Sequence, residues 1–158
     1  MPHTKLKVFS VLYIIAGAFC LLAALCVVIA TVVAGEEFTR LLAAENMSET
    51  MVKLLLAYTV VMYLAMGCTE LFAGISGIRF AGGSIDEKFC RIPAVILMAL
   101  NGLSLFLKII SWSLGGLLGT LFWLIIAVAY FSNVKKVEEY NKSRPSIDDM
   151  ALFNLKDI

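Results

Sequence analysis

Four long runs of apolar residues dominate the chain, and short polar segments separate them. The runs cover residues 8–34, 54–78, 92–112 and 114–132. The hydrocarbon core of a bilayer is about 30 Å thick, and about 20 helical residues cross it. Lipid offers no partner for backbone polar groups, which favours helices as the crossing elements. The pattern therefore predicts an all-α integral membrane protein, built as a four-transmembrane-helix bundle.

A soluble bundle of unusually apolar helices is the alternative. A soluble amphipathic helix carries a polar face that repeats every 3.6 residues. From Val11 to Ala34 no residue is more polar than Tyr13 or Thr31, so the first run has no such face. Apolar residues make up 61% of the chain and charged residues 16%, against roughly 45–50% and about 25% in soluble domains. Both departures favour lipid as the surroundings.

The distribution of Lys and Arg predicts the orientation, because short cytoplasmic loops carry an excess of both. Basic residues precede the first run, occupy the 79–91 connection and recur after residue 134, whereas the 35–50 connection has only Arg40 among four acids. We therefore expect cytoplasmic N- and C-termini. Lys108 lies near the outer end of its run, and we expect its ammonium to reach the headgroups. Aromatic residues favour membrane interfaces, so we expect Trp112 to be an outer anchor and Tyr130 an inner one.

The chain is predicted to comprise a transmembrane domain, residues 1–134, and a cytoplasmic extension, residues 135–158. Oppositely charged residues four apart, such as Glu138 and Lys142, support a helix that continues past the membrane. A capping-box pattern at residues 146–149 begins a last short segment. The tail is either solvated or docked on the protein's own cytoplasmic surface, a neighbour or the inner leaflet.

Three polar side chains occur at similar predicted depths in three different runs. At 1.5 Å per residue, Glu70 lies about 12 Å, Asn101 about 13.5 Å and Trp123 about 12 Å from the inner ends of their runs. Thr69 and Thr120 lie within about one turn of this layer. The sequence predicts that these five residues form an intramembrane polar layer, which is the candidate binding site.

Glu70 is the most informative residue, because an acid at the centre of a membrane helix costs about 2.5–3.5 kcal/mol on insertion scales. Two interpretations stay open. In the first, Glu70, Asn101 and Trp123 form a proton- or cation-responsive site. In the second, Glu70 and Asn101 hydrogen-bond to fix the register of their helices, at an average of only about 0.6 kcal/mol. At the same depth the first run has Gly17, and we expect a gap there.

Small residues at spacings that permit close helix contact occur in three runs. They are Gly17 in the first, Gly74 with Gly77 in the second, and Gly115 with Gly119 in the fourth. The sequence does not distinguish contacts within one subunit from contacts between subunits.

The four cysteines include no C-x-x-C pair, which argues against a zinc module or a redox motif. Cys20, Cys26 and Cys68 lie within runs and are expected to act as small apolar residues. Cys90 lies beside Arg91 at the predicted cytoplasmic surface. It is an inert thiol, a thiol whose pKa is lowered by its basic neighbour, or a palmitoyl acceptor.

Several functions are excluded by the residues that the chain carries. The single histidine, His3, cannot supply a bis-His haem, a His-based metal site or a Ser-His-Asp triad. The net charge of +1 gives no basic face for a nucleic acid. We therefore expect no catalytic residues, no metal, no cofactor and no nucleic-acid partner.

Three functions remain, and the first two are non-enzymatic. In the first, which we favour, a small polytopic protein acts as an interaction or accessory subunit of a larger membrane complex or a homo-oligomer. In the second, an oligomeric channel or transporter subunit uses intramembrane Glu70 as its proton- or cation-responsive group. An enzyme acting on lipid is a weaker third, because the charges near the inner interface have no recognised catalytic spacing. Compact loops and Lys-rich ends are typical of a multi-pass protein of a bacterial inner membrane, which is the cell-membrane location we predict.

Overall fold

The computed structural model describes residues 2–42, 48–110 and 114–143. These residues form four helices: α1 (Pro2–Leu42), α2 (Glu49–Ala81), α3 (Lys88–Ile110) and α4 (Leu114–Ser143). Each helix contains a stretch long and apolar enough to cross a membrane. The all-α prediction and the prediction of four candidate spans are confirmed, and the protein is a multi-pass membrane protein by these criteria.

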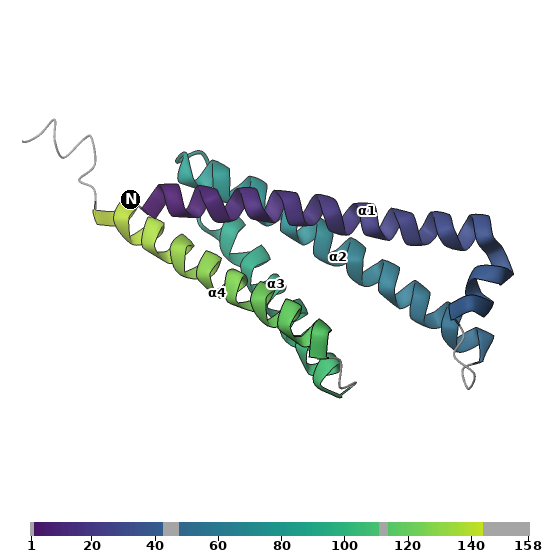
Figure 1. Cartoon of the computed structure of the whole chain (residues 1–158). Coiled ribbons are helices and arrows are strands. Elements are labelled where there is room, and N and C mark those ends of the chain that lie inside the picture. Colours follow the sequence, from purple (N-terminus) through teal and green to yellow (C-terminus); the bar gives the residue numbers. More distant parts are fainter. Residues whose placement is uncertain (1, 43–47, 111–113, 144–158) are drawn as a thin grey trace, which may run out of the picture.

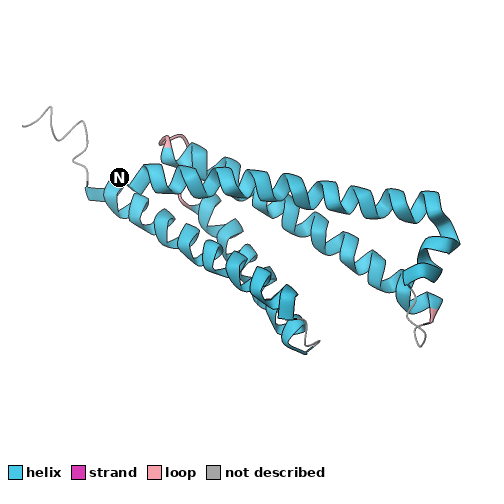
Figure 2. Cartoon of the chain, in the orientation of Figure 1, coloured by secondary structure: helices cyan, strands magenta, loops and turns pink. Residues whose placement is uncertain are grey.

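The helices form two antiparallel hairpins that diverge from a common end (Figures 1 and 2). The α1–α2 hairpin makes the most extensive helix–helix contact, and α3 and α4 form the second, shorter hairpin. The hairpins meet where the N-terminus, the α2–α3 connection and the end of α4 lie, which we call the narrow end. They diverge toward the α1–α2 and α3–α4 connections, which we call the wide end.

Glycines bring α1 and α2 into backbone contact. A Cβ atom built at Gly17 would lie 2.8 Å from the carbonyl oxygen of Gly67, and one at Gly74 would lie 2.6 Å from that of Ser10. Real Cβ contacts are essentially never shorter than 3.0 Å, so only glycine permits this approach. The expected gap beside Gly17 is therefore wrong, because the α2 backbone occupies that face.

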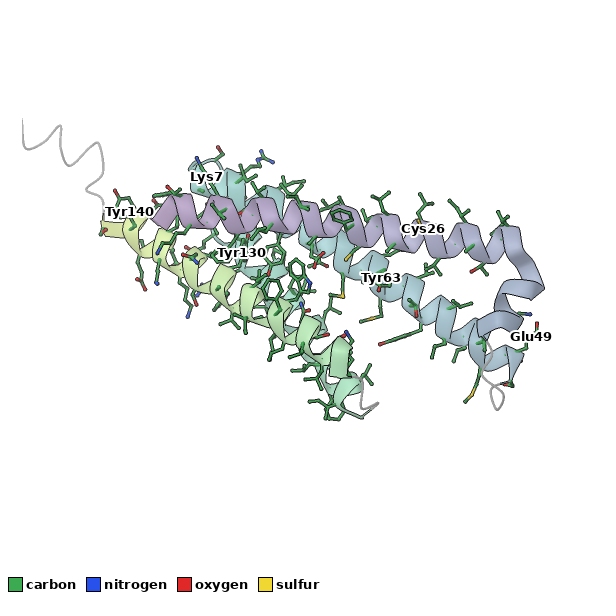
Figure 3. The ribbon with its side chains drawn as sticks, viewed as in Figure 1. Lys7, Cys26, Glu49, Tyr63, Tyr130 and Tyr140 are labelled. Carbon is green, nitrogen blue, oxygen red and sulfur yellow. The ribbon has the colours of Figure 1, made fainter. Side chains whose placement is uncertain are left out.

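The core lies at the narrow end and includes aromatic side chains from α1 and α4. The rings of Tyr13 and Tyr130 meet edge to face, with centroids 5.1 Å apart. The Tyr130 hydroxyl donates a hydrogen bond of 2.7 Å to the carbonyl of Ala73, which ties α4 to α2 (Figure 3). Tyr130 is fully buried, so its predicted role as an interfacial anchor is wrong. Its hydroxyl finds a partner inside the protein instead of in the headgroup region.

The core also contains Cys90, which is fully buried. The expected surface position of this thiol is wrong, because the first turn of α3 packs into the narrow end. Attachment of a palmitoyl chain requires access to the sulfur, and the surface of Cys90 is covered by its neighbours in the folded protein. The inert thiol is the interpretation that this burial favours.

The helix ends differ from the predicted run boundaries. Gly35, at φ 52° and ψ −130°, interrupts the helical backbone of α1, which then continues to Leu42. Glycine adopts this positive φ without the steric cost that a Cβ would bring. At the other end of the chain, α4 continues to Ser143 and carries the Glu138–Lys142 ion pair. Trp112 and the capping-box pattern at 146–149 lie outside the described residues.

Candidate functional site

A cavity of about 980 Å³ lies between the two hairpins, and all four helices line it. Small-molecule pockets are commonly 300–1,000 Å³ in volume, with mostly apolar walls and a few polar groups. Tyr63 extends from α2 toward this space (Figure 3). The charged, amide and indole side chains that line the cavity are Glu70, Lys108, Asn101 and Trp123, and hydroxyl groups come from Tyr58, Thr59, Tyr63, Ser104 and Thr120.

Four of the five residues of the predicted polar layer line this cavity: Glu70, Asn101, Thr120 and Trp123. Thr69 does not line it, and its hydroxyl donates to the carbonyl of Ala65 at 2.7 Å within α2. Successive residues on a helix are turned by about 100° from one another, and the direction that brings Glu70 into the cavity wall leaves Thr69 outside it. The predicted depth along the helix is therefore correct for the four residues that line the cavity. The direction of the side chain around the helix is what excludes Thr69 from the cavity wall.

Glu70 is almost completely buried in the cavity wall. Its side chain is 2% exposed. Cys20 of α1 lines the same cavity, and Glu70 Oε2 has no hydrogen-bond partner among the described residues. The hydroxyl of Tyr13 is likewise buried without a partner among them. A buried polar group left unsatisfied costs about 1–3 kcal/mol, so the Glu70 carboxyl gives the cavity hydrogen-bonding capacity that the described side chains do not use.

Asn101 is as buried as Glu70, at 2% exposure. Its Nδ2 donates to the carbonyl of Leu97 at 2.9 Å, which is a bond within its own helix. Among the described residues, therefore, no hydrogen bond joins the Asn101 amide to Glu70. The interpretation of this layer as a register-fixing pair loses its main support.

Lys108 also lines the cavity, and this position differs from expectation. Its ammonium donates a hydrogen bond of 2.5 Å to the hydroxyl of Thr120, which in turn donates to the carbonyl of Gly116 at 2.9 Å. The ammonium is therefore held beside α4, and its reach to the headgroups stays a prediction. The seven-residue spacing from Asn101, two helical turns, was the sequence signal that placed both residues on one face.

The aromatic wall of the cavity was not predicted. Phe19 of α1 and Tyr58 with Tyr63 of α2 line it together with Trp123 of α4. The sequence signal for this part of the cavity wall was the spacing of Ala16, Cys20 and Ala23 on α1. These small residues are three and four apart and share one helix face.

No protein-family model matches the chain, and no curated protein or solved structure matches it either. Within residues 2–42, 48–110 and 114–143, no group of three or more His, Cys, Asp and Glu side chains could hold a metal ion.

Proposed function

We propose that this protein is a non-enzymatic membrane carrier that binds a small organic cation with an apolar tail, using Glu70 as the cation- or proton-responsive group. The observation that supports this proposal is the position of Glu70. It is a deeply buried carboxyl in the wall of a cavity of suitable volume, and one of its oxygens has no partner among the described residues.

The chemistry of the cavity wall favours a cation over other small ligands. A carboxylate attracts positive charge, and four aromatic rings line the same space. Aromatic faces attract ammonium groups by about 0.5–2 kcal/mol, more when water is excluded. The remaining wall is largely aliphatic and suits an alkyl chain.

The proposed orientation follows from the basic residues at the narrow end. Lys5 and Lys7 begin α1, Arg79 and Lys88 flank the α2–α3 connection, and further lysines occur near the end of α4. Because Lys and Arg are enriched in cytoplasmic loops, we place the narrow end in the cytoplasm. The cavity then opens toward the opposite side of a bacterial inner membrane.

The interaction-subunit hypothesis stays a prediction with less support than before. It depended in part on small residues available for contacts between subunits. Gly17, Gly67 and Gly74 instead contact the partner helix of their own hairpin. A homo-oligomer or a larger complex remains compatible with the carrier proposal but is not needed to form the cavity.

The test measures uptake of radiolabelled octyltrimethylammonium, a permanent cation, into proteoliposomes. The wild-type protein should show saturable uptake, and Glu70→Gln should fall to the level of protein-free vesicles. Glu87→Gln removes a carboxyl outside the cavity wall and should behave like the wild type. Equal uptake by the wild type and Glu70→Gln would overturn the proposal, provided both variants give the same helical spectrum.

A further inference from the structure

The cavity contains a second charged side chain that the proposed function does not use. The Lys108 ammonium lies between α3 and α4, where it donates to Thr120. Lys108 follows Asn101 by seven residues, which is about 10 Å along α3 at the helical rise. Asn101 and Lys108 both line the cavity, so the ammonium marks a level nearer the wide end.

We propose that the cavity selects a zwitterionic amphiphile. Its cationic end binds at Glu70, its anionic end binds the Lys108–Thr120 pair, and its apolar spacer lies along the aromatic and aliphatic wall. This inference rests on the proposed function, because it assigns the second end of the ligand bound at Glu70.

The electrostatics of the two ends support this assignment. A carboxylate near Lys108 would accept a charge-assisted hydrogen bond, which is roughly twice as strong as a neutral one. A ligand with only a cationic group cannot form this bond, and the Lys108 charge repels it. The intramembrane location increases both effects, since charge–charge interactions strengthen as the surrounding dielectric constant falls.

The geometry also favours an extended ligand over a compact one. Cys20 of α1 and Glu70 of α2 both line the cavity, whereas Lys108 and Thr120 interact across α3 and α4. The two polar ends therefore belong to different hairpins. A ligand that reaches both would bridge the space between the hairpins.

Two probes that differ by one group test the inference. Octyltrimethylammonium carries the cation alone, and trimethylammonio-octanoate adds a carboxylate at the far end of the same chain. Binding in lipid nanodiscs is followed by the fluorescence of Trp123, in a Trp112→Phe background that leaves a single indole. We expect the zwitterion to bind at least about tenfold more tightly, a difference of about 1.4 kcal/mol.

The variants separate this inference from the proposed function. Lys108→Met should reduce the affinity ratio of the two probes to about one, while Lys108→Arg and the control Lys135→Met should keep the preference. If octyltrimethylammonium binds in a Glu70-dependent manner but the carboxylate adds nothing, or if its advantage survives Lys108→Met, the inference is wrong and the proposed function stands. If neither probe binds to the wild-type protein, both proposals are wrong.

Discussion

Replacing Gly74 with alanine tests whether the α1–α2 hairpin depends on direct backbone contact. The added Cβ would lie 2.6 Å from the Ser10 carbonyl oxygen, about 0.8 Å short of the 3.4 Å at which ordinary van der Waals contact begins. It would also lie 3.0 Å from the backbone nitrogen of Ile14. Because both are backbone atoms, no change of side-chain rotamer relieves the overlap, and α1 itself has to move.

The expected magnitude combines two opposing effects. Overpacking of a close contact costs about 1–3 kcal/mol, whereas Gly→Ala within a helix gains about 0.8–1 kcal/mol of helix propensity. Gly102→Ala supplies the matched control, since a Cβ there meets nothing within 4 Å. The propensity gain is common to both variants, so their difference in unfolding free energy, about 1–3 kcal/mol, reports the packing cost alone.

The assay is reversible unfolding by sodium dodecyl sulfate in mixed micelles, followed by circular dichroism and tryptophan fluorescence. We expect Gly74→Ala to unfold at a lower detergent fraction than the wild type, and Gly102→Ala at an equal or higher one. A Gly74→Ala protein as stable as Gly102→Ala would refute the claim that glycine is required for this helix contact.

Three further outcomes are expected from the same fold. Tyr130→Phe removes the hydrogen bond to the α2 backbone and should lose about 0.5–1.5 kcal/mol of stability. Tyr63→Phe should lose less, because Tyr63 is 39% exposed. Equal losses would contradict a contribution from the Tyr130 bond. In a protein whose other three cysteines are changed to alanine, Cys90 should react with a water-soluble maleimide only after unfolding, because it is fully buried. If the folded protein reacted as fast as the unfolded protein, the narrow end would not be closed. Lys142→Met should leave the unfolding midpoint unchanged, since exposed ion pairs such as the one with Glu138 contribute little to stability. A clear downward shift of the midpoint would indicate that this pair is part of a larger network.

The lengths of the apolar runs were enough to determine the number and type of elements. Each run crosses a bilayer only as a helix, because the backbone must satisfy its own hydrogen bonds in lipid. The rise per residue is constant, and depth could therefore be counted from the run ends. That count brought Glu70, Asn101 and Trp123 to one level, and the structure places all three in the wall of one cavity.

Direction around each helix was decided only by the tertiary structure. A membrane helix that is apolar on all sides has no polar face to indicate which side meets a neighbour. The sequence therefore predicted that Thr69 belongs to the site, that Lys108 does not, and that a gap lies beside Gly17. It also predicted that Tyr130 lies at the inner membrane interface. The divergence of the hairpins settles these four positions, because it turns one face of each helix toward the cavity or the core and leaves the others toward lipid.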